Sequence, residues 1–138
     1  MAGKTVVGGK MEVNGQVIPI SRAMRAKGEF IFASGQLPLD KQGKLVGEDI
    51  ETQTRQTLEN VKAILEQAGT TLDNVVKCTC WVASADHFPG FNKVYREFFP
   101  KDPPARSCVV SGFVVKGALV EVEAVALMPE QANVTARG

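Results

Sequence analysis

The sequence is poor in the residues that common catalytic motifs require. His87 is the only histidine among 138 residues, so the histidine pair used to cleave RNA cannot be assembled within one chain. A Ser-His-Asp triad through His87 would lack the nucleophile-elbow motif that accompanies many such triads. We therefore interpret His87 as a surface residue near the start of a helix.

Cysteine is also scarce. The three cysteines, Cys78, Cys80 and Cys108, are an odd number and do not have the spacing of a disulfide framework. Cys78 and Cys80 have no second pair of ligands at a zinc-site spacing, so we expect no metal site. The natural interpretation is reduced, buried thiols in a cytoplasmic protein.

Long apolar runs and an excess of charge are absent as well. No run approaches the roughly 20 residues that span a bilayer, and Met1 to Lys10 lacks the apolar stretch of a signal peptide. Sixteen basic residues against fifteen acidic ones leave a net charge of +1. A phosphate-binding surface usually needs a basic excess or stripe. We expect neither a membrane nor a nucleic acid as partner, and one globular domain covering residues 1–138.

The clearest predicted element is a helix over residues 50–68. Apolar side chains such as Leu58, Val61 and Leu65 recur there at steps of three and four and so share one face. Asp49 can cap the first turn, and Gly69 can adopt the left-handed conformation that ends a helix.

The remaining pattern predicts an α+β fold. A second apolar stripe predicts a helix over residues 86–99, and the first and last ten residues (1–10 and 129–138) are expected to be loose tails. Alternation predicts strands over residues 16–20, 29–33, 75–83, 106–111 and 118–128. The order β-β-α-β-α-β-β favours a sandwich with the helices on one sheet face. A partner subunit is the simplest cover for the other face.

Arg106 is the first candidate for chemistry. It opens a strand directly after Pro103, Pro104 and Ala105, which form a stiff approach. Its planar guanidinium can bind a carboxylate through two parallel hydrogen bonds, which suits a small carboxylic acid ligand. A surface salt bridge is the simpler alternative.

Glu121 and Glu123 are the second candidate. They share one face of an otherwise apolar strand, so they mark either a solvated face or a site. A glutamate in a partly enclosed crevice can hold and activate a water molecule. Burial would raise its pKa and a nearby arginine would lower it, so the sequence leaves the direction open.

Several segments together resemble the YjgF/RidA family. The resemblance spans about residues 16 to 128, and its motifs follow one another in the family's order and spacing. It rests on residues 104–109 (PARSCV) and 120–126 (VEVEAVA), on the loop 33–38 (ASGQLP), and on the helical segments 53–62 and 91–99.

This resemblance implies a chorismate-mutase-like fold assembled as a homotrimer, with a central barrel and three clefts between neighbouring subunits. It implies that Arg106 clamps the substrate carboxylate and that Glu121 holds the hydrolytic water. It places the backbone of Cys108, together with Ser34, Gly35, Phe91 and Asn92, around the ligand.

The implied activity is hydrolysis of enamines or imines derived from 2-amino acids to 2-oxo acids and ammonia, without cofactor or metal. Ile20 stands where family members often have a tyrosine, and Arg22 follows it. This departure leaves two alternatives: a dedicated pathway enzyme, such as a 2-aminomuconate deaminase, or a non-catalytic small-acid-binding or stress protein.

Overall fold

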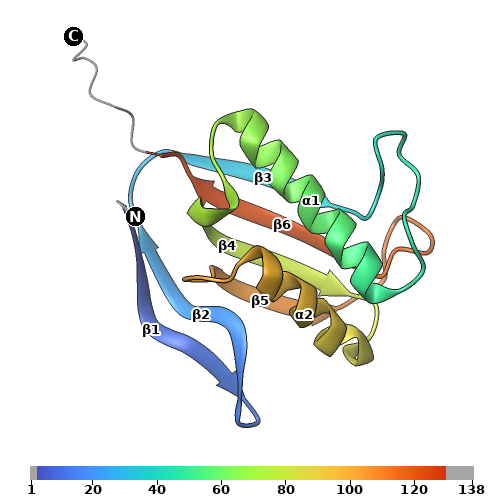
Figure 1. Cartoon of the computed structure of the whole chain (residues 1–138), viewed down its shortest axis with the longest axis horizontal. Coiled ribbons are helices and arrows are strands. Elements are labelled where there is room, and N and C mark those ends of the chain that lie inside the picture. Colours follow the sequence, from blue (N-terminus) through green and yellow to red (C-terminus); the bar gives the residue numbers. More distant parts are fainter. Residues whose placement is uncertain (1–2, 130–138) are drawn as a thin grey trace.

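The computed structural model describes residues 3–129 and contains one six-stranded sheet with both α-helices on the same face (Figure 1). The strand order is β1-β2-β5-β4-β6-β3. The elements are β1 (Lys4–Val13), β2 (Gln16–Ala26), β3 (Phe30–Gln36), α1 (Ile50–Ala68), η1 (Leu72–Asn74), β4 (Val75–Val82), η2 (Ala85–His87), α2 (Phe88–Phe98), β5 (Ala105–Val110) and β6 (Val120–Leu127). The predicted α+β class is confirmed. The predicted tail 129–138 lies, apart from Pro129, outside the described residues.

The expectation of a loose N-terminal tail, residues 1–10, is wrong for residues 4–10, and residues 1 and 2 lie outside the described residues. Lys4–Val13 forms β1, which pairs antiparallel with β2 (Figure 1). The two strands are joined at Asn14 and Gly15, whose φ angles are 51° and 81°. Two consecutive positive φ angles are typical of the tight turn that matches the twist of a hairpin, and Asn-Gly is its strongest sequence signal. That dipeptide could have revealed the additional strand.

The first helix agrees with its prediction at both ends. The carboxylate of Asp49 accepts a hydrogen bond from the backbone N–H of Thr52 at 2.9 Å. Gly69 ends the helix with a φ of 99°. The second predicted helix, 86–99, is divided in the structure into η2 and α2. A tight turn at η2 precedes the regular helix, which begins at Phe88 and has Pro89 in its first turn.

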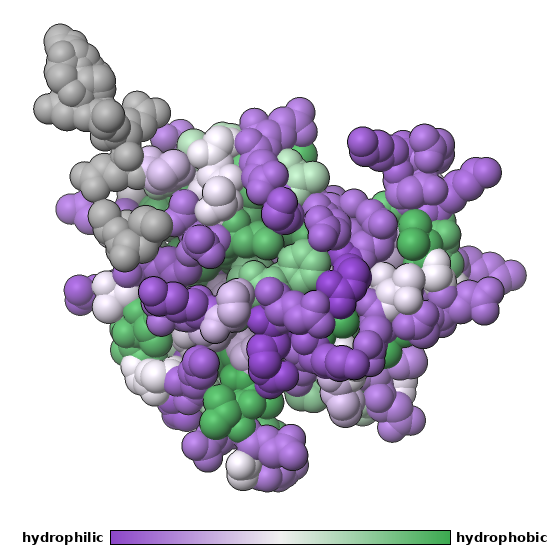
Figure 2. Space-filling view, in the orientation of Figure 1, coloured by the Kyte–Doolittle hydropathy of each residue, from purple (hydrophilic) through white to green (hydrophobic). Residues whose placement is uncertain are grey.

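The core lies between the two helices and the sheet. Its largest fully buried side chains come from α1, α2 and the central strands, and include Leu58, Leu65, Phe91, Tyr95, Val120 and Val122. Cys78 and Cys80 of β4 have no exposed surface, as predicted, and all three cysteines are free. The outer surface of the helices is mostly hydrophilic in Figure 2. In residues 3–129, no helix is both long and apolar enough to cross a membrane.

The opposite face of the sheet is left open by the single chain. Phe32 of β3 is 76% exposed and Val109 of β5 is 52% exposed. Both side chains point away from the helices, because their strand neighbours Ala33 and Cys108 point toward the core. Exposed apolar side chains gathered on one face are typical of an interaction surface.

A buried glutamine ties the loops at one end of the sheet to α1. Gln53 has no exposed surface, and its amide nitrogen donates to the carbonyl oxygens of Gly47 at 3.1 Å and Gly117 at 3.0 Å. Its carbonyl oxygen accepts from the N–H of Leu119 at 2.7 Å. Since Leu119 directly precedes β6, these bonds define where the strand that carries Glu121 begins.

Candidate functional site

Arg106 lies beneath α2 rather than on the surface. It is the second residue of β5 and pairs with Cys78 of β4, so its side chain points to the helix face of the sheet. Only 9% of it is exposed. The centre of its guanidinium lies 5.5 Å, 5.2 Å and 4.6 Å from the ring centroids of Phe88, Phe91 and Tyr95, respectively. Three rings of α2 thus stabilise the cation through their π faces.

This cation has no acidic partner in the part of the chain that the structure describes. The salt bridges there are formed by other side chains. One terminal nitrogen of Arg106, Nη1, is buried without a hydrogen-bond acceptor. An uncompensated buried charge is costly, whereas a carboxylate ligand could accept two parallel hydrogen bonds from the guanidinium. The surroundings of Arg106 therefore fit a small anion and do not match the surface salt bridge considered as the simpler alternative.

Two other expected site residues lie on the elements that surround Arg106, one on α2 and one on β5. Asn92 of α2 is 7% exposed, and its carbonyl oxygen Oδ1 is buried without a donor. Cys108 is half-buried and lies two residues along β5, on the same face as Arg106. Burial raises the pKa of the Cys108 thiol, and the positive charge of Arg106 only partly offsets this. A thiol held protonated is a poor nucleophile, which argues against covalent catalysis by Cys108.

Glu121 lies on the other face of the sheet. It pairs with Trp81 of β4, whose side chain alternates with the buried Cys80 and so points away from the helices. The Glu121 carboxylate packs directly against Gly35 of β3, where a β-carbon would overlap it. Ser34 precedes this glycine and is exposed on the same side of the molecule.

The loop after Gly35 is held by α1. The side-chain amide of Asn60 donates to the carbonyl oxygens of Leu37 and Leu39, both at 2.9 Å. These bonds fix the chain just beyond the glycine. The close approach of Glu121 to Gly35 is therefore supported by a rigid element.

The environment of Glu121 answers the question of its pKa that the sequence left open. Burial raises the pKa of the carboxyl, and the like charge of Glu123 raises it further. The opposing effect of a nearby arginine does not operate within one chain, since Arg106 faces the other side of the sheet. A carboxylate with a raised pKa is better suited to take a proton from water near neutral pH.

The expected site residues thus form two separate groups in one chain. One group lies on the helix face and comprises Phe91, Asn92, Arg106 and Cys108; the other lies on the open side and comprises Ser34, Gly35 and Glu121. Arg106 and Glu121 do not share a cavity within a single protomer. Sequence reasoning also missed Phe88 and Tyr95 as neighbours of the guanidinium. Their spacing with Phe91 predicted one apolar helix face but not the strand residue beneath it.

The departure at Ile20 has a simple structural description. Ile20 of β2 is buried, with 5% of it exposed. Arg22 is exposed, and its aliphatic stem lies against Gly8 of β1. Neither residue offers a hydroxyl group.

Within residues 3–129, no group of three or more His, Cys, Asp or Glu side chains is placed to hold a metal ion.

Comparison with known proteins identifies the family. The model of the family described as Endoribonuclease L-PSP matches residues 15–128. A RutC family protein of Pyrococcus horikoshii is 46% identical over 109 residues, which cover 78% of this chain and 86% of the relative. The 2-iminobutanoate/2-iminopropanoate deaminase of Salmonella typhimurium is 41% identical over 103 residues, covering 72% and 80%, respectively.

The fold is likewise shared with solved structures. A protein of the Rid family from Yersinia pestis, YyfB, superposes with a TM-score of 0.81 at 26% identity, covering 91% of this chain and 99% of that one. Yeast Mmf1 superposes with a TM-score of 0.70 at 32% identity, with the same coverage of both chains. The family match, the identities and the shared fold agree, and the chain belongs to the Endoribonuclease L-PSP family of YjgF/RidA proteins.

Proposed function

We propose that the protein is a hydrolytic deaminase that converts imines or enamines derived from 2-amino acids into 2-oxo acids and ammonia. The single observation that carries this proposal is the buried guanidinium of Arg106, which has an unused nitrogen and no acidic partner in the described residues. Such a group fits the carboxylate that all these substrates carry. The name of the Salmonella relative, at 41% identity, supports the same reaction class.

We further propose that each site forms between two protomers of a homotrimer. Arg106 and Glu121 point to opposite faces of one sheet, so a second copy must supply whichever is missing from a given site. The open face with Phe32 and Val109 supports such an assembly, because it offers apolar surface for a partner to bury. In this arrangement the Arg106 group of one protomer would meet the Glu121 group of its neighbour.

The chemistry follows from these roles. The substrate carboxylate binds Arg106, which fixes the adjacent C2 carbon, and the enamine takes up a proton at carbon to become the imine. Glu121 accepts a proton from water while the water oxygen bonds to C2. Glu121 passes this proton to nitrogen, and the C–N bond breaks as the new hydroxyl group gives its own proton to Glu121. Ammonia leaves, the hydroxyl becomes the carbonyl of the 2-oxo acid, and Glu121 returns its proton to solvent. Positioning is the main contribution, because a protonated imine is already electrophilic.

The three free thiols support a reducing compartment, so we place this activity in the cytoplasm.

A subunit-mixing experiment tests both proposals. Pyruvate release from 2-aminoacrylate, generated in situ from serine by a dehydratase, is measured for Arg106→Ala, for Glu121→Gln, and for an equimolar mixture reassembled from denatured chains. Each variant alone should lose most of the activity. If every site combines Arg106 of one chain with Glu121 of the next, half of the chains supply each group, and the mixture should recover about a quarter of the wild-type rate.

Full activity of Arg106→Ala would show that the arginine is not the carboxylate anchor. A mixture as inactive as its parents, from chains that reassemble, would reject the shared site.

A further inference from the structure

A second cleft lies where three distant segments of the chain meet. Its volume is about 220 Å³, and its lining residues come from β1, from η1 and from the loop between α2 and β5: Lys4, Val6, Asp73, Lys101 and Asp102. Arg106 and Glu121 are not among them. The volume is below the range of about 300–1,000 Å³ typical of sites for drug-sized ligands, so it suits a small metabolite.

Four charged side chains line this cleft, and no two of them form a direct salt bridge. Among the described residues, no ion pair within 4.0 Å involves Lys4, Asp73, Lys101 or Asp102. Lys4 is half-buried and its ammonium donates one hydrogen bond to the backbone carbonyl of Asp73. That bond leaves two N–H donors of the ammonium available.

The positive charge of Lys4 is only partly compensated by the carboxylates around it. Burial lowers its pKa, and the attraction of Asp102 and Asp73 only partly opposes this effect. A ligand that brought a negative charge to Lys4 would therefore improve its environment. The same ligand would also approach Asp102 and Asp73, whose carboxylates favour a positive charge.

We infer that this cleft is a binding site for a free α-amino acid in its zwitterionic form. Its carboxylate would pair with Lys4 and Lys101, and its ammonium with Asp102 and Asp73. Two cations and two anions suit a ligand that carries one charge of each sign, whereas a simple anion such as phosphate would face two uncompensated aspartates. Val6 provides an apolar wall for a small side chain.

This inference is independent of the proposed deaminase activity, because it uses none of the residues assigned to that reaction. The pairs are partly exposed to solvent, so each is expected to contribute only modestly to binding. We therefore expect an affinity in the millimolar range and a requirement for both charged groups of the ligand.

The test is a titration of the ¹⁵N-labelled full-length protein with L-alanine, followed by NMR. Two fragments of the ligand serve as probes: acetate, which carries only the negative charge, and methylammonium, which carries only the positive one. L-alanine should shift the amide resonances of residues 4–6, 73, 101 and 102 in a saturable manner. Each fragment should bind about fivefold more weakly, since losing a charge pair costs up to about that factor.

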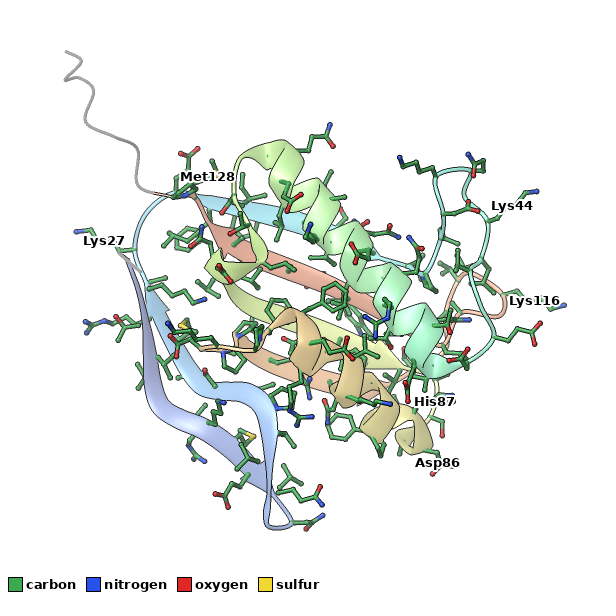
Figure 3. All side chains as sticks on the ribbon, in the orientation of Figure 1. Lys27, Lys44, Asp86, His87, Lys116 and Met128 are labelled. Atoms are coloured by element: carbon green, nitrogen blue, oxygen red, sulfur yellow. The ribbon has the colours of Figure 1, made fainter. Side chains whose placement is uncertain are left out.

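Two variants and two matched controls locate the binding. Lys101→Met and Asp102→Asn should each weaken the affinity for L-alanine by about fivefold. Asparagine tolerates the φ of 47° that Asp102 adopts, so the second variant removes the charge and preserves the backbone. The controls Lys116→Met and Asp86→Asn change the same residue types far from the cleft. The backbone of Lys27 is hydrogen-bonded to Gly3, next to Lys4, and Lys116 and Asp86 lie at the opposite end of the molecule from Lys27 (Figure 3). They should bind like wild type.

The inference is overturned if L-alanine causes no saturable shifts, if acetate binds as tightly as L-alanine, or if both cleft variants bind normally. Repeating the titration with Arg106→Ala separates the two sites. Binding that survives this substitution belongs to the cleft. Binding that disappears with it belongs to the proposed active site and also rejects the inference, whatever the deaminase assay shows.

Discussion

The carboxylate of Glu121 lies directly against the backbone of Gly35, in space that the β-carbon of any other residue would occupy. Gly35 has no positive φ, so the glycine is required by this contact rather than by the backbone conformation. A main-chain segment of β3 thereby determines where the proposed water-holding group can lie.

Gly35→Ala should consequently impair catalysis more than folding. The added methyl group meets the carboxylate end of the flexible Glu121 side chain. This side chain can move aside at little cost in stability, but its carboxylate then leaves the productive position. Moving a catalytic group by about 1 Å can lower the rate by about 100-fold. The measurement is kcat/KM for pyruvate release together with the midpoint of thermal unfolding. Gly112→Ala is the control, since a β-carbon there meets nothing within 4 Å. Equal loss in both variants would contradict the prediction.

The pH dependence should report on Glu123. Burial and the neighbouring Glu123 both raise the pKa of Glu121. If the ionised form of Glu121 accepts the proton from water, kcat/KM falls as the pH drops through this pKa. Glu123→Gln removes the like charge, lowers the pKa of Glu121, and should move the acidic limb of the profile to lower pH. Glu123→Asp keeps the charge and serves as the control. An unmoved limb in Glu123→Gln would exclude Glu121 as the titrating group.

Arg106 is expected to bind the ligand carboxylate while lowering the stability of the fold. Replacing a buried charge by an apolar side chain of similar length often stabilises a protein. The free energy of unfolding of Arg106→Met, measured by denaturant titration, should therefore be higher than that of wild type by about 1 kcal/mol or more. The same variant should no longer be stabilised by 2-oxobutanoate, whereas wild type should be. Arg55→Met is the comparison, because Arg55 is exposed and paired with Glu97. A strongly destabilised Arg106→Met would identify the guanidinium as a structural group instead.

Assembly should depend on the open sheet face. Phe32 is 76% exposed there, and Phe32→Glu would place a charge in any interface that covers it. We expect this variant to be monomeric in sedimentation velocity at concentrations where wild type should form the proposed trimer, and to have lost the proposed activity. Val114→Glu changes an even more exposed apolar residue, 96% exposed, in the loop before β6. It should assemble normally. A trimeric Phe32→Glu would place the interface elsewhere.

Local patterns in the sequence were sufficient for most of the secondary structure. The first helix was predicted from Ile50 to Ala68 because its apolar spacing, its Asp49 cap and its terminal Gly69 are all encoded within a few neighbouring residues. The order of the strands and α-helices from β2 onward, the α+β class and the burial of Cys78 and Cys80 followed from the same kind of local signal. β1 was missed because its exposed, glycine-containing sequence has little alternation, although Asn14-Gly15 encodes the turn that creates it.

The arrangement of the site was decided by the tertiary structure. Strand alternation predicted that Arg106 and Cys108 share a face and that Glu121 and Glu123 share another, but alternation within one strand does not say how the faces of two strands correspond. That relation depends on the register of β4 with β5 and β6, which places Arg106 beside Cys78 and Glu121 beside Trp81. Register is a long-range property, set by how the buried side chains of all three strands pack under the helices. The sequence by itself therefore determined which residues are available for chemistry, and only the packed sheet decided that one chain presents them on opposite sides.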